Sequence, residues 1–285
     1  MNLQSPKKFK MMVDQAHEVA LNVLRPISRK YDKAEHAYPK ELDMLASLID
    51  GMNEGGEGIN AGAAVGKRGE TETGNKNGNN MSTALGIIEM CYGDTGLLLS
   101  MPRQGLGNSA IAAVANDEQL ERFKGTWAAM AITEPGCGSD SAAIRTTATQ
   151  DGDEYILNGE KIFVTSGDRA DSVVVWATLD KKLGRAAIKS FVVPKGTAGM
   201  KVERLEHKLG IKASDTAVIS FIDCRVPAAN LLGNPEIDVA KGFAGVMETF
   251  DNTRPLVAAM AIGCAKASLE RIKEIFKDQL DPDYK

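Results

Sequence analysis

Short runs of β-branched residues occupy the middle of the chain, between two stretches of helical periodicity. They read WAAMAIT, EYILNGEKIFVTSG, DSVVVWATL, IKSFVVP and MKVERLEHKLGIKASDTAVISFIDCRVP. Gly, Asp, Asn and Pro separate them at spacings typical of an all-β unit. We therefore predict a small β barrel or sandwich over residues 126–235. Asn158 and Gly159 are expected to form a tight hairpin turn in it.

The flanking stretches have the three- and four-residue spacing of helices that bury one face. The first helical pattern covers residues 9–24, and Pro26 is expected to end that helix. Further helical patterns cover residues 40–50, 81–101 and 109–123. In the last of these, the expected buried stripe consists of Ala112, Ala113, Leu120 and Phe123. The spacing returns after residue 239. The sequence thus predicts an N-terminal helical domain at 1–125, a middle β domain at 126–235 and the start of a C-terminal helical domain at 236–285.

Residues 51–80 hold nine glycines and almost no side chain large enough to pack. We interpret this segment as a long mobile loop, with a flap over a binding site as the alternative.

Composition excludes several classes of function. A net charge of -4 and a pI near 5.6 argue against nucleic acid as a partner. The four cysteines have no paired spacing, and the three histidines cluster neither with each other nor with the cysteines, so no metal site is expected. No apolar run has the length of a signal sequence or of a membrane span. We expect a cytoplasmic protein with reduced thiols.

Five stretches carry a resemblance to a known family. They are MAITEPGCGSD, DGDEYILNGEKIFVTSG, LGIKASDT, CRVPAANLLG and FDNTRPLVAAMAIG. In this order and spacing they resemble successive blocks of the acyl-CoA dehydrogenase family, from about residue 92 to about residue 269. The resemblance implies an α+β multidomain fold with a helical N-terminal domain, a middle β-barrel domain and a C-terminal helical bundle, of which only the start is present.

The resemblance also implies FAD, bound where the middle and C-terminal domains meet. A flat flavin ring approached by main chain needs small neighbours and free N–H groups, which explains the bare TEPGCGSD turn. Phe163 stands where the family usually has tryptophan, which keeps the apolar surface but removes an N–H donor. Carried onto this chain, the FAD contacts are Met130, Ile132, Thr133, Gly138, Ser139, Phe163, Val164 and Thr165.

The implied activity is α,β-dehydrogenation of an acyl-CoA thioester, as in fatty-acid β-oxidation. The resemblance assigns substrate contacts to Ser139, Asp251, Thr253 and Arg254. In most members the catalytic glutamate lies on a later segment, which would fall beyond Lys285. In a minority it stands at the position of Thr253, which cannot act as that base. We therefore expect an N-terminal portion of such an enzyme, without an identifiable catalytic base.

The expected electron acceptor is an electron-transfer flavoprotein, and a homo- or hetero-oligomer is expected because a lone bundle helix cannot bury its apolar stripe. That stripe contains Val257, Met260, Ala261, Cys264 and Leu269. Three alternatives stay open. One is a non-catalytic subunit of a mixed oligomer whose partner supplies the base, and another is an oxidase on the same fold. The third, a β-domain adaptor without flavin, conflicts with the ordered blocks.

Overall fold

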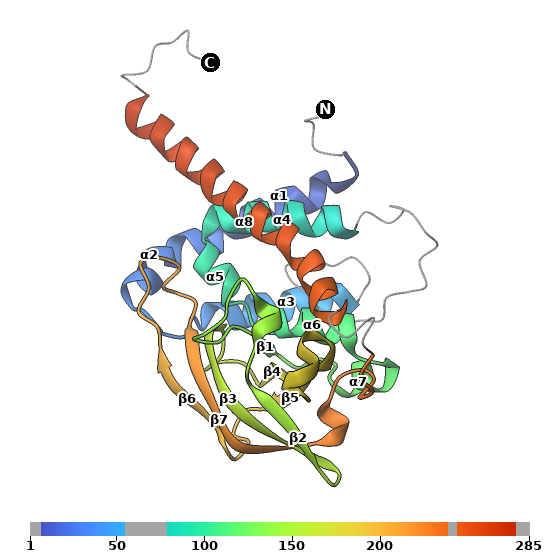
Figure 1. Ribbon diagram of the computed structural model, residues 1–285. Helices are drawn as coiled ribbons and strands as arrows, with labels where there is room; N and C mark the ends of the chain where they lie inside the picture. The colour runs from blue at the N-terminus through green and yellow to red at the C-terminus, as the bar shows by residue number, and fades with distance from the viewer. Residues whose placement is uncertain (1–6, 55–78, 239–243, 278–285) are drawn as a thin grey trace.

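The computed structural model describes residues 7–54, 79–238 and 244–277. A helical region, a curled sheet and a long final helix follow one another along the chain, as predicted (Figure 1). The domain boundaries at residues 125 and 235 stay predictions.

The first helical run continues past the proline that was expected to end it. It consists of η1 (Lys7–Phe9), α1 (Lys10–Val19), the π-helical turn η2 (Ala20–Leu24) and α2 (Arg25–Lys33). Pro26 lies in the first turn of α2. A proline ring crowds the carbonyl four residues before it. Directly before Pro26 the helix widens, and the Arg25 N–H donates to the carbonyl of Ala20, five residues back.

In the described part of the N-terminal region five further helices follow: α3 (Glu41–Glu54), α4 (Asn79–Gly93), α5 (Thr95–Leu99), α6 (Leu106–Val114) and α7 (Asp117–Arg122). Residues 51–54 belong to α3, so the predicted loop does not begin at residue 51, and 55–78 lie outside the described residues.

The pattern over residues 109–123 was read as one helix, but the structure has two. The first ends at Val114, and Asn116 caps α7, accepting the Gln119 N–H at 2.9 Å. Phe123 is buried as expected, whereas Ala112 and Ala113 are only half-buried.

The sheet consists of β1 (Ala128–Ala131), β2 (Thr147–Asp151), β3 (Glu154–Thr165), β4 (Ser172–Thr178), β5 (Ile188–Pro194), β6 (Met200–Leu205) and β7 (Thr216–Pro227). The order is β1-β4-β2-β3-β7-β6, with β5 also on β4. β1 and β2 run parallel to β4, and the other pairs are antiparallel. β1 also contacts β3, so the sheet curls around an apolar interior.

The Asn158–Gly159 hairpin prediction is wrong. The turn between β2 and β3 falls at Gly152, which has a φ of +65°, and Asp151 pairs with Glu154 across it. Asn158 and Gly159 lie inside β3, where the register with β7 shifts. A Cβ on Gly159 would stand 2.4 Å from Thr146 Oγ1, so the glycine permits close contact between chain segments.

The final helix, α8 (Ala244–Phe276), packs against α4 and α6 (Figure 1). Gly263 permits this approach, because a Cβ there would lie 2.3 Å from the Ile88 carbonyl oxygen. Lys266 Nζ donates to both carboxylate oxygens of Glu89, at 2.8 and 2.9 Å. None of the described helices is both long and apolar enough to cross a membrane.

The outer face of α8 is apolar and exposed, as the sequence predicted for Val257 and Leu269, which are 59% and 54% exposed. The expectation is wrong for Met260, which packs partly buried against the core of the helical region. Helices α4 and α6 therefore cover one side of α8 only.

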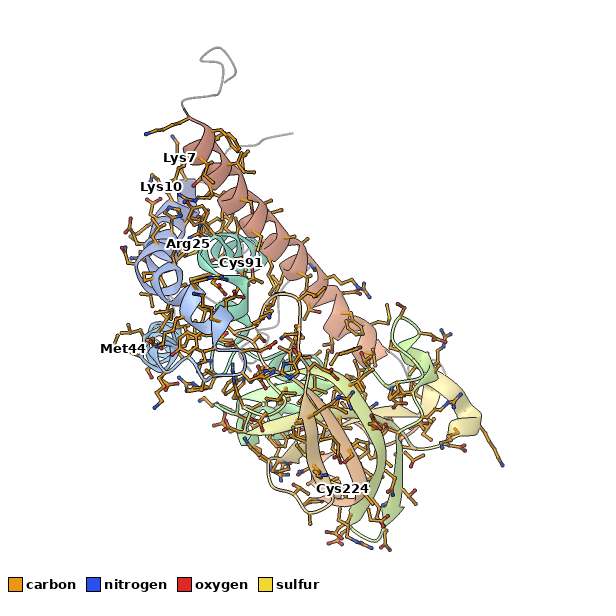
Figure 2. All side chains as sticks on the ribbon, turned by 90° about the vertical axis from the view of Figure 1, so that its left-hand side faces the viewer. Lys7, Lys10, Arg25, Met44, Cys91 and Cys224 are labelled. Atoms are coloured by element: carbon orange, nitrogen blue, oxygen red, sulfur yellow. The ribbon has the colours of Figure 1, made fainter. Side chains whose placement is uncertain are left out.

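The chain's two tryptophans, Trp127 and Trp176, both pack on the sheet. Trp127 belongs to its interior with Phe191, whereas Trp176 lies on the face that packs against α6 and Val246 of α8. The four cysteines are free thiols, with Cys91 among the helices and Cys224 in the sheet (Figure 2).

Candidate functional site

A tight turn follows β1 and leaves bare backbone at the surface. Glu134 and Cys137 exchange backbone hydrogen bonds of 3.0 and 3.1 Å, with Pro135 and Gly136 at the corner. A Cβ added to Gly136 would meet no described atom within 4 Å, and one on Gly138 would meet only Thr133 Cγ2, at 3.9 Å. The turn therefore borders open space, into which exposed Gly138 and Ser139 face.

The end of β3 turns an aromatic side chain outward. Phe163 has a φ of +58° and is 61% exposed, whereas the next residue, Val164, is fully buried in the sheet interior. The register of β3 with β7 shifts between Lys161 and Val164. A left-handed conformation is uncommon for a bulky residue, and bulges of this kind redirect side chains. The fold thus holds Phe163 at the surface against local preference.

Three hydrogen bonds join these segments. The Ile162 N–H donates to the Thr133 carbonyl at 2.9 Å. Lys161 Nζ donates to Glu134 Oε1 at 2.7 Å and to the Ile132 carbonyl at 3.0 Å. Sequence reasoning missed this ion pair, although a lysine within an apolar strand was a signal for a buried partner.

The environment keeps the pair ionised at neutral pH. Burial lowers the pKa of Lys161 to about 8, against the attraction of Glu134. Burial alone would raise the pKa of Glu134, but the charge and hydrogen bond of Lys161 outweigh it and lower that pKa. Thr146 adds a 2.6 Å hydrogen bond from its hydroxyl and Arg145 a 2.6 Å hydrogen bond from its backbone N–H.

The predicted cofactor contacts on β1 and just after it lie next to those at the end of β3, and we call this place the sheet edge. Thr133 and Thr165 are half-buried, and so is Met130, whereas Ile132 is 7% exposed. Met130 packs in the same apolar cluster as Val246 and Phe250 of α8. The start of the last helix thus lies beside this edge.

The predicted substrate contacts on α8 point in different directions. Asp251 and Arg254 are exposed and form an ion pair of 2.8 Å with each other. Thr253 is 6% exposed, and its hydroxyl donates to the Phe250 carbonyl at 3.4 Å. Among the described interactions, no hydrogen bond or ion pair joins Ser139 to any of the three.

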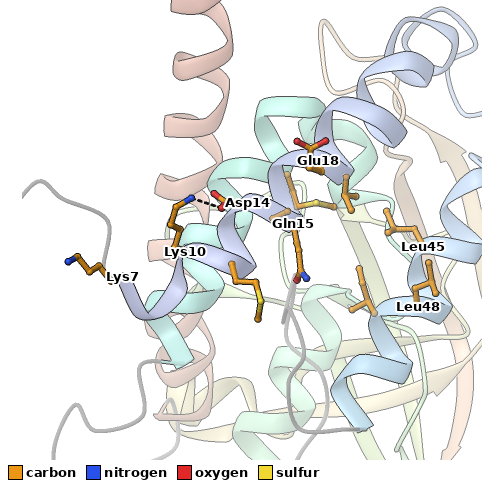
Figure 3. A pocket seen from close by; sticks show the side chains of 12 residues that line it. Lys7, Lys10, Asp14, Gln15, Glu18, Leu45 and Leu48 are labelled. Atoms are coloured by element: carbon orange, nitrogen blue, oxygen red, sulfur yellow. Dashed lines mark hydrogen bonds and ion pairs between the residues drawn. The ribbon is translucent and has the colours of Figure 1, made fainter.

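A cavity of about 750 Å³ lies elsewhere, between α1 and α3 (Figure 3). Its lining includes Met11, Leu45 and Leu48, with the Lys10–Asp14 ion pair at the rim. None of the predicted site residues lines it. The sheet edge is the better candidate for the site, because it has the bare backbone, hydroxyls and exposed ring that a flat polar ligand needs.

The expectation that the histidines do not cluster is wrong for two of them. The ring centroids of His36 and His207 lie 5.3 Å apart. Neither residue belongs to the sheet-edge turn. His17 instead bonds Glu89, at 2.8 Å.

The comparisons with known proteins point to one family. Residues 129–224 match the acyl-CoA dehydrogenase middle domain. Acryloyl-CoA reductase (NADH) of Anaerotignum propionicum is 33% identical over 95% of this chain and 66% of its own length. The short-chain specific acyl-CoA dehydrogenase of Clostridium acetobutylicum is 30% identical over 98% of this chain and 71% of its own. The chain thus spans about two thirds of the length of these relatives.

Solved structures are similar over the same extent. Butyryl-CoA dehydrogenase from Megasphaera elsdenii has a TM-score of 0.79 and 30% identity, covering 99% of this chain and 72% of its own. A chain in the structure of the electron transferring flavoprotein of Acidaminococcus fermentans has a TM-score of 0.75 and 32% identity, covering 99% and 71%.

Proposed function

The chain belongs to the acyl-CoA dehydrogenase family, and on that premise we propose that it takes part in FAD-dependent α,β-dehydrogenation of an acyl-CoA thioester. The observation that carries the proposal is the exposed ring of Phe163, held at a φ of +58° beside the bare turn at residues 134–139. An exposed aromatic residue in a strained conformation, next to unfilled backbone, is a feature that a packed core does not require.

The residues of this edge fit FAD in chemistry. Gly138 and Ser139 offer main-chain N–H groups and a hydroxyl for a pyrophosphate. Thr133 and Thr165 offer hydroxyls for the polar edge of a flavin, and Phe163 offers an apolar plane. When bound, FAD supplies the acceptor for the hydride that leaves the β carbon. We assign Met130 and Ile132 to the apolar walls of the same site, and Val164, whose side chain is fully buried, contributes its main chain.

Substrate contacts are assigned to Ser139 and to the exposed Asp251–Arg254 pair. Because Arg254 is already paired with Asp251, its charge is partly neutralised, and the two side chains together offer a donor and an acceptor to the polar arm of CoA. The site must also hold the thioester away from water, since proton removal from the α carbon needs a base with a raised pKa in a dry pocket.

Thr253 is not that base. A threonine hydroxyl does not accept a proton at neutral pH, and this one is buried and donates to the Phe250 carbonyl. We propose that the carboxylate comes from outside the described residues. We also propose that an electron-transfer flavoprotein is the electron acceptor, supported by the similarity to a chain in a solved structure of such a flavoprotein.

The test starts from the purified chain, without a tag, incubated with FAD and freed of excess cofactor. The proposal expects yellow protein with one FAD per chain. If the carboxylate base lies in this chain, anaerobic addition of acyl-CoA thioesters of graded length should bleach the flavin, and the length that bleaches it fastest identifies the substrate class. Reoxidation by electron-transfer flavoprotein but not by air separates a dehydrogenase from an oxidase. A chain that refuses FAD overturns the assignment.

The environment of Thr253 favours one alternative, a subunit that binds FAD but needs a partner for the base. In that case the flavin binds, acyl-CoA alone does not bleach it, and adding the partner restores bleaching. The apolar outer face of α8, with Val257, Leu269 and Ile272 exposed, supports association with another chain. Light scattering behind gel filtration tests for the oligomer.

A further inference from the structure

Two histidines and a glutamate meet where the helical region contacts the sheet. Glu35 and His36 lie in the loop after α2, and His207 lies between β6 and β7. One nitrogen or oxygen atom of each lies within 4.8 Å of those of the other two. The closest pair is Glu35 Oε2 and His207 Nδ1, at 3.0 Å.

His36 has two ring nitrogens without a partner. Both are shielded from solvent, and neither has a hydrogen bond among the described residues. A buried imidazole in this state loses its hydration without compensation, which costs free energy. The ring of His207, 5.3 Å away between centroids, lies beside it. The unused lone pair of His36 is therefore available to a ligand that enters between the two rings.

The backbone holds two of the three side chains in place. His36 has a φ of +68°, and Arg169 donates to the carbonyls of His36 and Ala37 at 3.3 and 3.0 Å. Arg169 is itself anchored by a buried ion pair of 3.2 Å with Asp215. Glu35 accepts the Lys208 N–H at 3.0 Å. His207, whose side chain is 84% exposed, is the least constrained of the three.

We propose that Glu35, His36 and His207 form a site for a divalent transition metal of the Zn²⁺ type. Zinc bonds imidazole nitrogen and carboxylate oxygen at about 2.0 to 2.2 Å, which sets tetrahedral ligand atoms about 3.3 Å apart. The 3.0 Å pair of Glu35 and His207 opens slightly to this spacing, and rotation of His207 brings its ring nitrogen closer to that of His36. The metal takes the place of the proton between His207 Nδ1 and Glu35, and in a neutral His207 ring that proton moves to Nε2. Water takes the fourth position.

Local charge selects among metals. The carboxylate of Glu35 is hydrogen-bonded to His207 Nδ1 at 3.0 Å and accepts the Lys208 N–H at 3.0 Å, so these two partners orient it. The carboxylate is therefore ready to ligate, but it is the only anionic ligand, and Lys208 and Lys212 oppose a cation held by charge alone. Mg²⁺ and Ca²⁺ depend on several oxygens, whereas imidazole suits Zn²⁺, Co²⁺ and Ni²⁺.

The test uses the full chain without a histidine tag, stripped with a chelator and titrated calorimetrically with ZnCl₂. We expect one Zn²⁺ per chain and no heat with MgCl₂. His207→Ala and His36→Ala should each weaken binding by about tenfold or more, as loss of a directly ligating group must cost at least as much as loss of its support. Glu35→Gln should weaken it as well.

Two matched variants serve as controls. His17→Ala removes the remaining histidine, and Glu41→Gln removes another hydrogen-bonded carboxylate, which contacts Lys30 and Tyr31 instead. Both should bind Zn²⁺ as the unaltered chain does. Because His207 is exposed, His207→Ala should keep its melting temperature without metal and lose only the rise that Zn²⁺ produces. Absence of binding, or equal binding by His207→Ala, overturns the proposal.

Discussion

Lys161 Nζ and Glu134 Oε1 stand 2.7 Å apart in the interior, with 0% and 6% of their side chains exposed. The pair connects β3 to the turn after β1, and these two segments carry the proposed cofactor contacts. We infer that this buried ion pair, and not a contact between the turn and the Phe163 ring, fixes the positions of both.

Replacing Lys161 by Met should lower the free energy of unfolding by about 3 to 5 kcal/mol, because it leaves the Glu134 carboxylate buried without its counter-charge. Urea denaturation measures this loss. Lys201→Met, which removes an exposed partner of Glu203, should leave the midpoint almost unchanged. Adding Glu134→Gln to Lys161→Met should restore part of the stability. If the double variant instead lost as much unfolding free energy as the two single variants lose together, this account would be contradicted.

A crossed pair of glycine variants separates cofactor binding from folding. Gly138→Ala should keep stability, because its Cβ would meet only Thr133 Cγ2 at 3.9 Å, yet weaken FAD binding if cofactor lies against that backbone. Gly152→Ala should do the opposite, because a φ of +65° costs an alanine about 1 to 2 kcal/mol while the hairpin lies at the far end of β3. Fluorimetric FAD titration and calorimetric melting give both quantities. FAD binding that is equal in the two variants would argue against the proposed site.

Phe163→Gly should weaken FAD binding while leaving the free protein at least as stable. The ring is 61% exposed and contributes little packing, and glycine relieves the strain of the φ of +58°, worth about 1 kcal/mol. Ile222→Ala, which removes a side chain that is 67% exposed on β7, is the control and should leave FAD binding unaltered. A loss of stability in Phe163→Gly would show that the ring packs in the free protein.

Glu41 should make the protein sensitive to acid. Hydrogen bonds from Lys30 and then Tyr31 lower its pKa to about 2 from 4.5. A depressed pKa in the folded state contributes stability that is complete above about pH 4.5 and is lost as the pH falls through about 2. Glu41→Gln should therefore flatten the decline in stability over that window, whereas Glu121→Gln on α7 should not. Carboxyl chemical shifts of Glu41 followed by NMR check the midpoint directly.

Local patterns predicted the order of helices, sheet and helix well, because five ordered motifs and a change of periodicity each point to the same architecture. They failed where one residue type is compatible with two different local structures. Gly159 reads as a turn residue beside Asn158, but its missing side chain makes room for Thr146. Pro26 is typical of a helix end, but the π-helical turn before it accommodates the proline ring and the helix continues.

The sequence predicted only those residues of the candidate site that lie within recognisable motifs. The glycine turn and Phe163 follow from the sequence blocks, whereas the partner of Lys161 depends on strand pairing. Glu35 and His207, 172 positions apart, meet only because the loop after α2 folds onto the one before β7. No spacing rule within a single segment reveals such a pair.

Trp127 and Trp176 both pack against the sheet, so tryptophan fluorescence and circular dichroism report on different parts of the chain. Intrinsic emission comes from the sheet and its contact with α6 and α8, while far-ultraviolet circular dichroism is dominated by the helices. Denaturation curves that coincide would mean that α1 to α5 and the sheet lose their structure in one cooperative step. Curves that separate would identify the helical layer as an independent unit.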